Sequence, residues 1–490
     1  MTAALEPSLS RANVARQGVL LLSGYAAAQI LSFARNALIG HWLSKGDFGI
    51  AASITLVLQL LETVSDLGAD RLIVQAGDGD DPRLVASGHS TLVARGGISA
   101  LLLYLAAGPI VAFFSIPEAR WAFEAAALIP LVKGFQHLDP RRFQRRLLNR
   151  AQMIVEAGPQ AIALAATLPM LTLAPGYDAV LWLAILQAVS ALLISQLLAE
   201  RAYALALDSG HLARLVAFGW PIWLSAFPLI AVYQGDRFII GRLLGMEGLA
   251  AFTTAFMVTM VPGLVAAKVG HALLLPLFAG VAGDHARLVG RFRVASETVA
   301  TAAAIYLAGF LVAGGGVVAL AFGPQYAGLD LLVAWLATMW SLRMIQAVPG
   351  MALMATGETR PFLVAGLLRA AALPAAYLAA RDGLGLTGVA AAGVAGELAS
   401  LVYIALRAER AVAGLGRALA VPTLLLTPAG LLAASAAMAL PAGAGLGAEL
   451  AAAGAVSIII ILMALIGLRQ TRQLALGLLS SRPAAPRPIR

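Results

Sequence analysis

The sequence predicts an all-α polytopic membrane protein of about fourteen transmembrane helices. Two six-helix lobes, related by a pseudo-two-fold axis along the membrane normal, are followed by two further helices. Of the 490 residues, 60% are hydrophobic and only 12% charged, whereas soluble chains carry about 25% charged residues. Apolar runs of roughly 20 residues, each able to cross about 30 Å of hydrocarbon as a helix, recur along the chain. A motif near residue 40 also returns near residue 240, which indicates an internal repeat.

The expected spans follow one another with short connections. The first six cover residues 17–41, 48–74, 88–114, 120–137, 151–174 and 178–200. The next eight cover residues 212–243, 248–276, 290–322, 330–353, 362–380, 386–406, 419–440 and 446–468. With the N-terminus inside, about 23 of the 34 Lys and Arg residues fall on the cytoplasmic side and about 4 outside. This asymmetry follows the positive-inside rule and places both termini in the cytoplasm.

The first span has an alternative interpretation. Arg11 and Arg16 precede an apolar run, and the alanines at 26–28 resemble the cleavage site of a signal peptide. Because the apolar stretch continues to Ile39, beyond the length of a typical signal core, we expect a retained first helix.

Polar residues recur at helical spacing in the first two spans. The first span carries Gly24, Ala28, Ser32 and Arg35, and the second carries Thr55, Gln59, Glu62, Asp66 and Asp70. Steps of three and four residues place each set on one face of a helix. Because such a face is costly against lipid, we expect it to line a bundle interior or an aqueous cavity.

The densest basic segment is "LDPRRFQRRLLNRAQ", between the fourth and fifth spans. Its arginines are Arg141, Arg142, Arg145, Arg146 and Arg150. We interpret it as a basic loop at the membrane surface, either a topology anchor or a short helix lying on anionic headgroups. The tail "SRPAAPRPIR" is Pro-rich and basic, and we expect it to be disordered.

The repeat is carried by "LIGHWLSKGDFGIAA", residues 38–52, and "IIGRLLGMEGLAA", residues 239–251. Each copy closes one expected helix and opens the next. Because an even number of spans separates the copies, both lobes should have the same orientation in the membrane. The expected domains are therefore residues 1–206, residues 207–410, and an extension over residues 411–490 with two helices and the basic tail.

Several segments resemble patterns of a known family. They are "KGDFGIAA", "VSDLGADRLIVQ", "LDPRRFQRRL", "GDRFIIGRLLGMEGLAAF", "LLPLFAGVAGDHARL", "FGPQYAGLDLL" and "MATGETR". Their order and spacing, over roughly residues 15 to 400, resemble the polysaccharide transporter (oligosaccharide flippase) family of the multidrug/oligosaccharidyl-lipid/polysaccharide exporter superfamily. The resemblance implies a non-enzymatic transporter in the bacterial inner membrane. It would flip a polyprenyl-diphosphate-linked oligosaccharide to the outer leaflet, for a cell-surface polysaccharide such as an exopolysaccharide or O-antigen.

The resemblance also implies partners. These are the lipid-linked oligosaccharide, membrane lipids, and a polysaccharide polymerase or export machinery. No cofactor and no nucleic acid is expected, because the basic residues follow the topology of a membrane chain despite the net charge of +9. Energy is expected from the membrane potential, at about 2.3 kcal/mol per charge per 100 mV, or from ion exchange.

Charges within the expected spans are the candidate site residues, because each costs about 2.5 to 3.5 kcal/mol to place in a bilayer. The candidate substrate-binding cations are Arg35, Arg95, Arg237, Lys268, Arg343 and Arg369. Together they predict a cationic central cavity for an anionic ligand. The resemblance implies that this ligand is moved by alternating access. Arginine also suits bidentate binding of phosphate.

The acids have two interpretations that the sequence leaves open. Glu62, Asp66 and Asp70 bind coupling protons or sodium, or they pair with arginines such as Arg35, Arg71 or Arg95. Asp236 and Arg237 are adjacent, so they point about 100° apart on a helix and cannot pair ideally with each other. Arg237 forms either an ion pair between the lobes, for instance with an acid of the second span, or a contact with phosphate.

Other functions are disfavoured by what the sequence lacks. It has no cysteine, no clustered histidine motif and no G-x-x-x-x-G-K-[ST] loop, which argues against thiolate chemistry, a metal site and ATP hydrolysis. Asp78 and Asp80 match the D-x-D pattern of glycosyltransferases, but no nucleotide-binding domain accompanies them. The main alternative is a multidrug or other small-molecule antiporter of the same superfamily.

Overall fold

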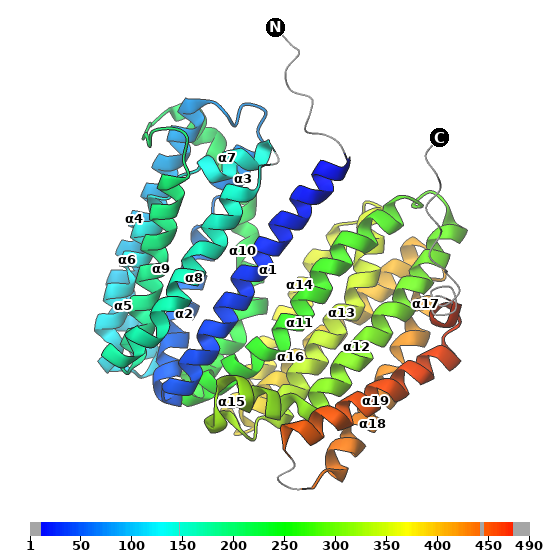
Figure 1. Ribbon diagram of the computed structural model, residues 1–490. Coiled ribbons are helices and arrows are strands. Elements are labelled where there is room, and N and C mark those ends of the chain that lie inside the picture. The colour runs from blue at the N-terminus through cyan, green and yellow to red at the C-terminus, as the bar shows by residue number, and fades with distance from the viewer. Residues whose placement is uncertain (1–10, 147, 442–444, 474–490) are drawn as a thin grey trace, which may run out of the picture. The chain divides into compact units, whose positions relative to one another are not determined.

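The computed structural model describes residues 11–146, 148–441 and 445–473. Within these ranges every regular element is a helix, which confirms the all-α prediction. The chain divides into two compact units, Met1–Ala250 and Ala251–Arg490, which are described separately below (Figure 1). The expected basic tail lies outside the described residues.

Twelve helices in the described ranges are long and apolar enough to cross a membrane, so the chain is a multi-pass membrane protein. Two further expected spans are helical but are not among these twelve helices. The span at 17–41 lies within α1 (Arg11–Trp42), whose helix runs through the alanines at 26–28. The span at 120–137 is divided into α5 (Arg120–Ala126) and α6 (Leu128–Gly134).

The first unit contains α1 to α10. Besides α1, α5 and α6, these are α2 (Lys45–Ser65), α3 (Ala69–Gln75), α4 (Pro82–Phe114), α7 (Asp139–Arg145), α8 (Arg150–Leu173), α9 (Tyr177–Leu197) and α10 (Ser209–Leu243), with a 3₁₀ turn at Pro117–Ala119. In this unit α8 packs against α1 and α9, α4 packs against α6, and α10 packs against α2 and α4 (Figure 1).

Polar side chains fix where several of these helices begin. Asp81 caps α4 by accepting from the backbone N of Arg83, and Pro82 follows at the first helical position. Asp208 caps α10 by accepting from the backbone N of His211. A carboxylate at this position satisfies an otherwise unpaired helix N–H, which stabilises a helix by about 1 kcal/mol.

The second expected span is broken, contrary to the prediction of one helix over residues 48–74. It ends at Ser65, and α3 begins at Ala69. Gly68 adopts a left-handed φ of 63°, which glycine tolerates best, and the Asp66 carboxylate accepts from its backbone N at 2.9 Å. The predicted polar face therefore ends at the break, and Asp70 lies on a different helix from Glu62.

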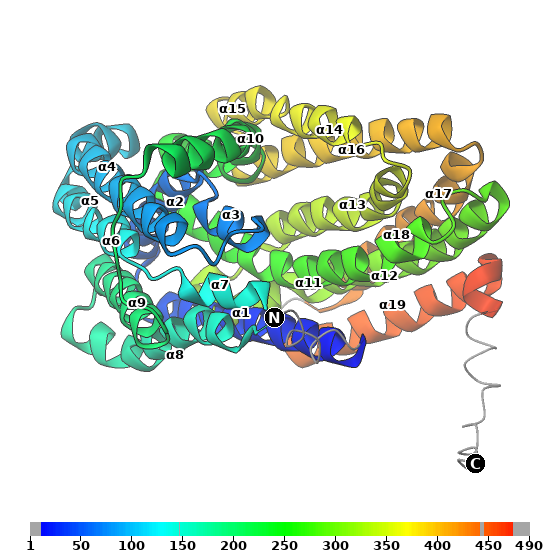
Figure 2. The same ribbon diagram turned by 90° about the horizontal axis from the view of Figure 1, so that it is seen from above.

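The second unit is organised around its longest helix, α12. Its helices are α11 (Gly245–Ala279), which begins in the first unit, α12 (His285–Phe322), α13 (Asp330–Ala355), α14 (Arg360–Ala370), α15 (Leu373–Arg381), α16 (Gly385–Ala411), α17 (Leu415–Thr423), α18 (Leu426–Ala439) and α19 (Leu446–Gly467), with a 3₁₀ turn at Pro324–Tyr326. Helix α12 packs against α13 and α17, while α14 and α15 run along α16 (Figure 2).

The last two expected spans correspond to α17 with α18, and to α19. They pack on α12 through small side chains, among them Ala304, Ala308 and Ala453. Small residues let membrane helices approach closely, and this contact gives the C-terminal extension a fixed place within its unit. The boundary between the two compact units falls after Ala250, so α10 belongs to the first unit. The repeat-based lobes, 1–206 and 207–410, stay a prediction.

Candidate functional site

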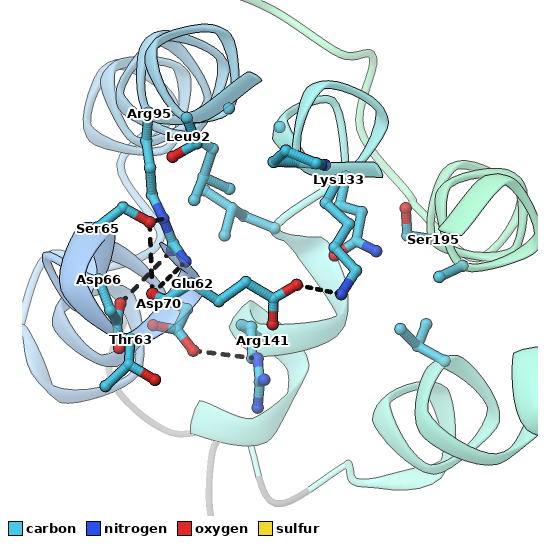
Figure 3. A pocket seen from close by; sticks show the side chains of 18 of the residues that line it. Glu62, Thr63, Ser65, Asp66, Asp70, Leu92, Arg95, Lys133, Arg141 and Ser195 are labelled. Atoms are coloured by element: carbon cyan, nitrogen blue, oxygen red, sulfur yellow. Dashed lines mark hydrogen bonds and ion pairs between the residues drawn. The ribbon is translucent and has the colours of Figure 1, made fainter. Parts of the chain in front are cut away.

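A polar cavity of about 700 Å³ lies within the first unit. Side chains from α2, α3, α4, α6, α7, α8, α9 and α10 line it. The break between α2 and α3 lies at its wall, with Glu62 before the break and Asp70 after it (Figure 3). The interruption that the sequence prediction missed therefore forms part of the cavity wall.

Eight ionic side chains line this cavity, and their formal charges cancel. The cations are Arg71, Arg95, Lys133 and Arg141, and the acids are Glu62, Asp66, Asp70 and Glu156. His137 also lines it; its Nδ1 lies 3.0 Å from the backbone N of Asp139 and its Nε2 3.1 Å from the carbonyl of Arg201, the pattern of a neutral ring. This cavity within the first unit is electrically balanced, and the cationic central cavity that the sequence predicts between its two lobes stays a prediction.

At the helix break, Asp66 organises two of the cations. Its Oδ2 lies 3.1 Å from Nη2 of Arg71, and its Oδ1 lies 3.5 Å from Nη1 of Arg95. Arg95 also donates to Ser65 Oγ and to the carbonyl of Glu62, so it caps the open end of α2 (Figure 3). Helix ends in a membrane need such partners because no lipid group can replace them.

The remaining acids bind cations from other helices. Nζ of Lys133 lies 2.5 Å from Oε1 of Glu62 (Figure 3). Arg141 lies between two acids, with its Nε 3.5 Å from Asp70 Oδ2 and its Nη2 3.9 Å from Glu156 Oε1. Of the two interpretations of Glu62, Asp66 and Asp70, this structure displays pairing with cations.

Uncharged polar groups complete the lining. They are Thr63, Ser65, Ser99, Gln136, Gln152, Gln160, Gln187, Ser195 and Ser225. Amides and hydroxyls both donate and accept hydrogen bonds, as a sugar does. Ionic and neutral polar groups therefore share one chamber, which suits a ligand with a charged part and a polyhydroxylated part.

The basic segment does not act as one surface loop, and Arg142 is the main correction. Its side chain is 2% exposed, and it binds Asp139 at 2.8 Å, Asp80 at 3.1 Å and Glu200 at 3.0 Å. Burial alone would raise the pKa of Asp139, but hydrogen bonds from Arg142 and the backbone of Arg201 hold that pKa below its usual value. This buried cluster fixes α7 to two connections of the unit.

The other arginines of the segment have separate places. Arg141 lines the cavity, and Arg145 caps α3 by donating to the carbonyls of Ile73, Val74, Ala76 and Gly77. Arg146 is half exposed and lies 3.4 Å from Asp80, and Arg150 is exposed at the start of α8. Only these last two have the exposure that a membrane-surface role requires.

Both carboxylates of the D-x-D pattern bind arginine. Asp78 accepts from Arg214 at 2.6 and 2.9 Å, and this contact holds the pKa of Asp78 below its usual value. Asp80 contacts Arg142, Arg145 and Arg146. The motif therefore joins the connection between α3 and α4 to α10 and to α7.

The remaining candidate residues of the first unit lie outside this cavity. Arg35 donates to Gln187, whose side chain lines the wall. Asp236 and Arg237 are half-buried near the end of α10, where Asp236 accepts from the backbone N of Arg237 at 2.8 Å. The side chain of Lys268, in α11, lies outside the described residues.

In the second unit, Arg343 and Arg369 meet at one acid. Glu397, 2% exposed, lies 2.6 Å from Nε of Arg343 and 2.8 Å from Nε of Arg369. Arg369 also donates to Gln346, which in turn donates to Ser400. These contacts join α13, α14 and α16 through a buried ionic network.

Sequence reasoning overlooked Lys133, Glu156 and Glu397 as site residues. Each is a charge within an expected span, at 120–137, 151–174 and 386–406 respectively. The signal that selected the other candidates was therefore present at these positions as well. Arg141 was missed for a different reason, because a dense basic loop is the usual mark of a topology anchor.

Comparison with known proteins places the fold. The structure resembles a structure titled "Lipid II flippase MurJ, inward closed conformation" with a TM-score of 0.71, over 90% of this chain and 98% of that chain, at 10% identity. It also resembles an inward-facing MATE multidrug resistance transporter of the MOP superfamily, with a TM-score of 0.58 over 81% and 99% of the chains, at 16% identity. A third similar structure, of MATE in complex with MaD3S, gives 0.53 over 82% and 96%, also at 16% identity. No curated protein sequence matches this chain significantly.

Fold and site together describe a multi-pass membrane protein that has the fold these MurJ and MATE structures share. A family profile described as "Polysaccharide biosynthesis protein" matches residues 40–329, more than half of the chain. The chain therefore belongs to the polysaccharide biosynthesis protein family, and the resemblance seen in its sequence is confirmed.

Proposed function

We propose that this transporter moves a polyprenyl-diphosphate-linked oligosaccharide from the cytoplasmic to the outer leaflet of the bacterial inner membrane. The product would be a cell-surface polysaccharide such as an exopolysaccharide or O-antigen. The observation that carries the proposal is the cavity, where four cations lie beside amides and hydroxyls inside a membrane bundle. The family assignment and the likeness to a lipid II flippase support the same substrate class.

The balanced charge of the cavity shapes the proposed mechanism. A diphosphate entering a neutral chamber must displace carboxylates from their cations, or the carboxylates must be neutralised. Glu62, Asp66 and Asp70 would bind protons or sodium at this step and release their cations to the phosphates. On return they would pair with the cations again, which resets the cavity.

The proposal includes a topology and a cycle. Both termini would be cytoplasmic, and lobes 1–206 and 207–410 would open the site alternately to the two sides of the membrane. The helices of residues 411–490 would support the second lobe or shelter the lipid tail. A polysaccharide polymerase or export machinery would take the substrate on the outer side.

The test uses the purified full chain in liposomes that contain a fluorescent polyprenyl-diphosphate-linked sugar. Leaflet exchange is measured by quenching from outside. Exchange should be faster than in protein-free liposomes, and Glu62→Gln and Asp66→Asn should slow it about tenfold while the protein stays folded. Asp382→Asn, at an exposed carboxylate bound to Arg381, is the matched control. Exchange at the protein-free rate with the wild-type chain would refute the proposed function.

A small-molecule antiporter is the second candidate, because the equal number of acids and cations in the cavity also suits a cationic drug. The fold likeness to MATE transporters is shared by both candidates. The same liposomes loaded with a cationic dye separate them. Dye export without movement of the sugar lipid would favour the antiporter.

A further inference from the structure

The four cavity cations are held with unequal strength. Lys133 contacts Glu62 at 2.5 Å, Arg71 contacts Asp66 at 3.1 Å, and Arg95 is held by two hydrogen bonds of 3.0 and 3.1 Å besides its ion pair. Arg141 lies 3.5 Å from Asp70 and 3.9 Å from Glu156; the Arg95–Asp66 ion pair is also 3.5 Å long, but Arg95 has its two hydrogen bonds in addition. Loose, partly hydrated ion pairs contribute little to stability, so the guanidinium of Arg141 is the easiest to redirect.

The backbone that carries Arg141 is held firmly by contrast. The next residue, Arg142, is buried among three carboxylates, and Arg145 binds four carbonyls at the end of α3. A fixed backbone with a loosely held guanidinium reduces the ordering cost of ligand binding. The backbone of Arg141 is thus already in place, and its guanidinium can turn from its acids to an incoming anion.

The acids facing Arg141 come from two different helices. Asp70 lies on α3 and Glu156 on α8, and Gln152 donates at 2.9 Å to the same Glu156 oxygen that faces Arg141. Each carboxylate competes with any anion that approaches this guanidinium. Phosphate oxygens match a guanidinium in bidentate geometry, so a phosphate group can outcompete one loosely placed carboxylate.

We infer that Arg141 is the capture residue for a phosphate or diphosphate group, and that Asp70 and Glu156 act as competing anions that weaken this capture. The inference rests on the proposed function and assigns the first phosphate contact within it. It changes the role of Arg141 from a topology anchor to a specificity-determining residue. Its distinctive consequence is that the two sides of one ion pair have opposite effects on affinity.

The test measures binding to the full chain in nanodiscs. The probe is a fluorescent polyprenyl-diphosphate-linked N-acetylglucosamine, and inorganic diphosphate is the competitor. Arg141→Gln should weaken binding at least about tenfold, because charge-assisted hydrogen bonds to phosphate are lost. Glu156→Gln should tighten binding about two- to fivefold, because a competing carboxylate is removed. Arg146→Gln, on a half-exposed arginine just after the C-terminal end of α7, is the control and should bind like wild type.

Competition by inorganic diphosphate shows whether the protein recognises a free phosphate group or only one that is part of a lipid headgroup. Displacement of the probe by inorganic diphosphate, lost in Arg141→Gln, means that the phosphate group alone is recognised. An Arg141 effect without such displacement means that the phosphate is recognised as part of the lipid headgroup. Either result supports capture by Arg141.

Two results would overturn the inference. One is wild-type affinity in Arg141→Gln, and the other is equal weakening in Arg141→Gln and Glu156→Gln, which a merely structural ion pair would produce. Thermal unfolding of each variant identifies a folding defect. If Arg141→Gln is misfolded, the Glu156→Gln variant decides: tighter binding supports the inference, and weaker or unchanged binding overturns it. If wild type flips the sugar lipid and Arg141→Gln does so with unchanged concentration dependence, the inference fails and the proposed function stands.

Discussion

Each unit contains a network of ion pairs between arginine or lysine and carboxylates, but the two networks differ in their exposure to solvent. In the cavity of the first unit, every paired ionic side chain is between 25 and 58% exposed. In the second unit, Glu397 is 2% exposed, and Arg343 and Arg369 are 11 and 20% exposed. Water can stabilise a separated charge in the first network but hardly in the second.

This difference indicates which ion pairs can open to bind a ligand or a proton. Exposed ion pairs are worth about 0.2 to 1 kcal/mol, so a ligand or a proton can exchange them. A buried pair that loses one partner leaves an uncompensated charge, at about 3 to 5 kcal/mol. We therefore expect the cavity network to govern transport, and the Glu397 network to hold α13, α14 and α16 together.

The largest effect is expected for Glu397→Gln. The substitution removes the buried carboxylate that contacts two largely buried guanidinium groups, so the free energy of unfolding should fall by about 3 to 5 kcal/mol. Thermal unfolding in detergent measures the loss, with Asp382→Asn at an exposed pair as the control. A decrease below about 1 kcal/mol would remove the contrast between the two networks.

The next effect concerns the buried cluster of the first unit. Asp139 is fully buried against Arg142, so Asp139→Asn should lower the free energy of unfolding by about 2 to 3 kcal/mol. The loss is smaller than at Glu397 because Arg142 keeps Asp80 and Glu200. Asp80→Asn, at a partly exposed carboxylate, should have less effect. An equal loss from both variants would contradict this ranking.

The same cluster predicts a response to acid. The pKa of Asp139 is lower in the folded protein than its usual value, so its contribution is fully present above about pH 4 and is lost as pH falls through the folded pKa. Unfolding temperatures measured from pH 5 to pH 3 should therefore fall less steeply in Asp139→Asn than in wild type. Parallel curves would show that Asp139 does not set this dependence.

The smallest effect on stability is expected in the cavity. Glu62→Gln and Arg71→Gln should each change the free energy of unfolding by less than about 1 kcal/mol, because water replaces the lost partner. Thermal unfolding provides the measurement. A loss of several kcal/mol would mean that the cavity pairs are structural in the same sense as Glu397.

The membrane architecture was predictable because its cause is local. A run of about 20 apolar residues must form a helix in hydrocarbon whatever surrounds it, so the expected spans match membrane-length helices such as α4 and α13. Charges inside spans likewise identified Arg95, Glu62, Asp66 and Asp70 as residues of interest, and the structure brings these four to one cavity.

Partners and interruptions were harder to predict because they depend on tertiary contacts. Nothing local indicates that Arg142 is buried while its neighbour Arg141 lines a cavity, since both belong to one basic run. The break at Gly68 was hidden because helical spacing of the acids suggested continuity. Its local signal was a glycine two residues after an aspartate, which can bond the glycine N–H.

The end of α2 inside the bundle restricts which cavity residues can be replaced without loss of backbone hydrogen bonds. Arg95 donates a hydrogen bond to the carbonyl of Glu62, and Arg145 donates to carbonyls of α3. These two cations therefore satisfy backbone carbonyls at the ends of two helices. Replacing them to suit a different ligand would remove hydrogen bonds that these carbonyls accept from the guanidinium groups. Changes of cargo are instead expected at wall amides and hydroxyls such as Gln136, Gln160 and Ser225, where a substitution leaves the helix ends intact.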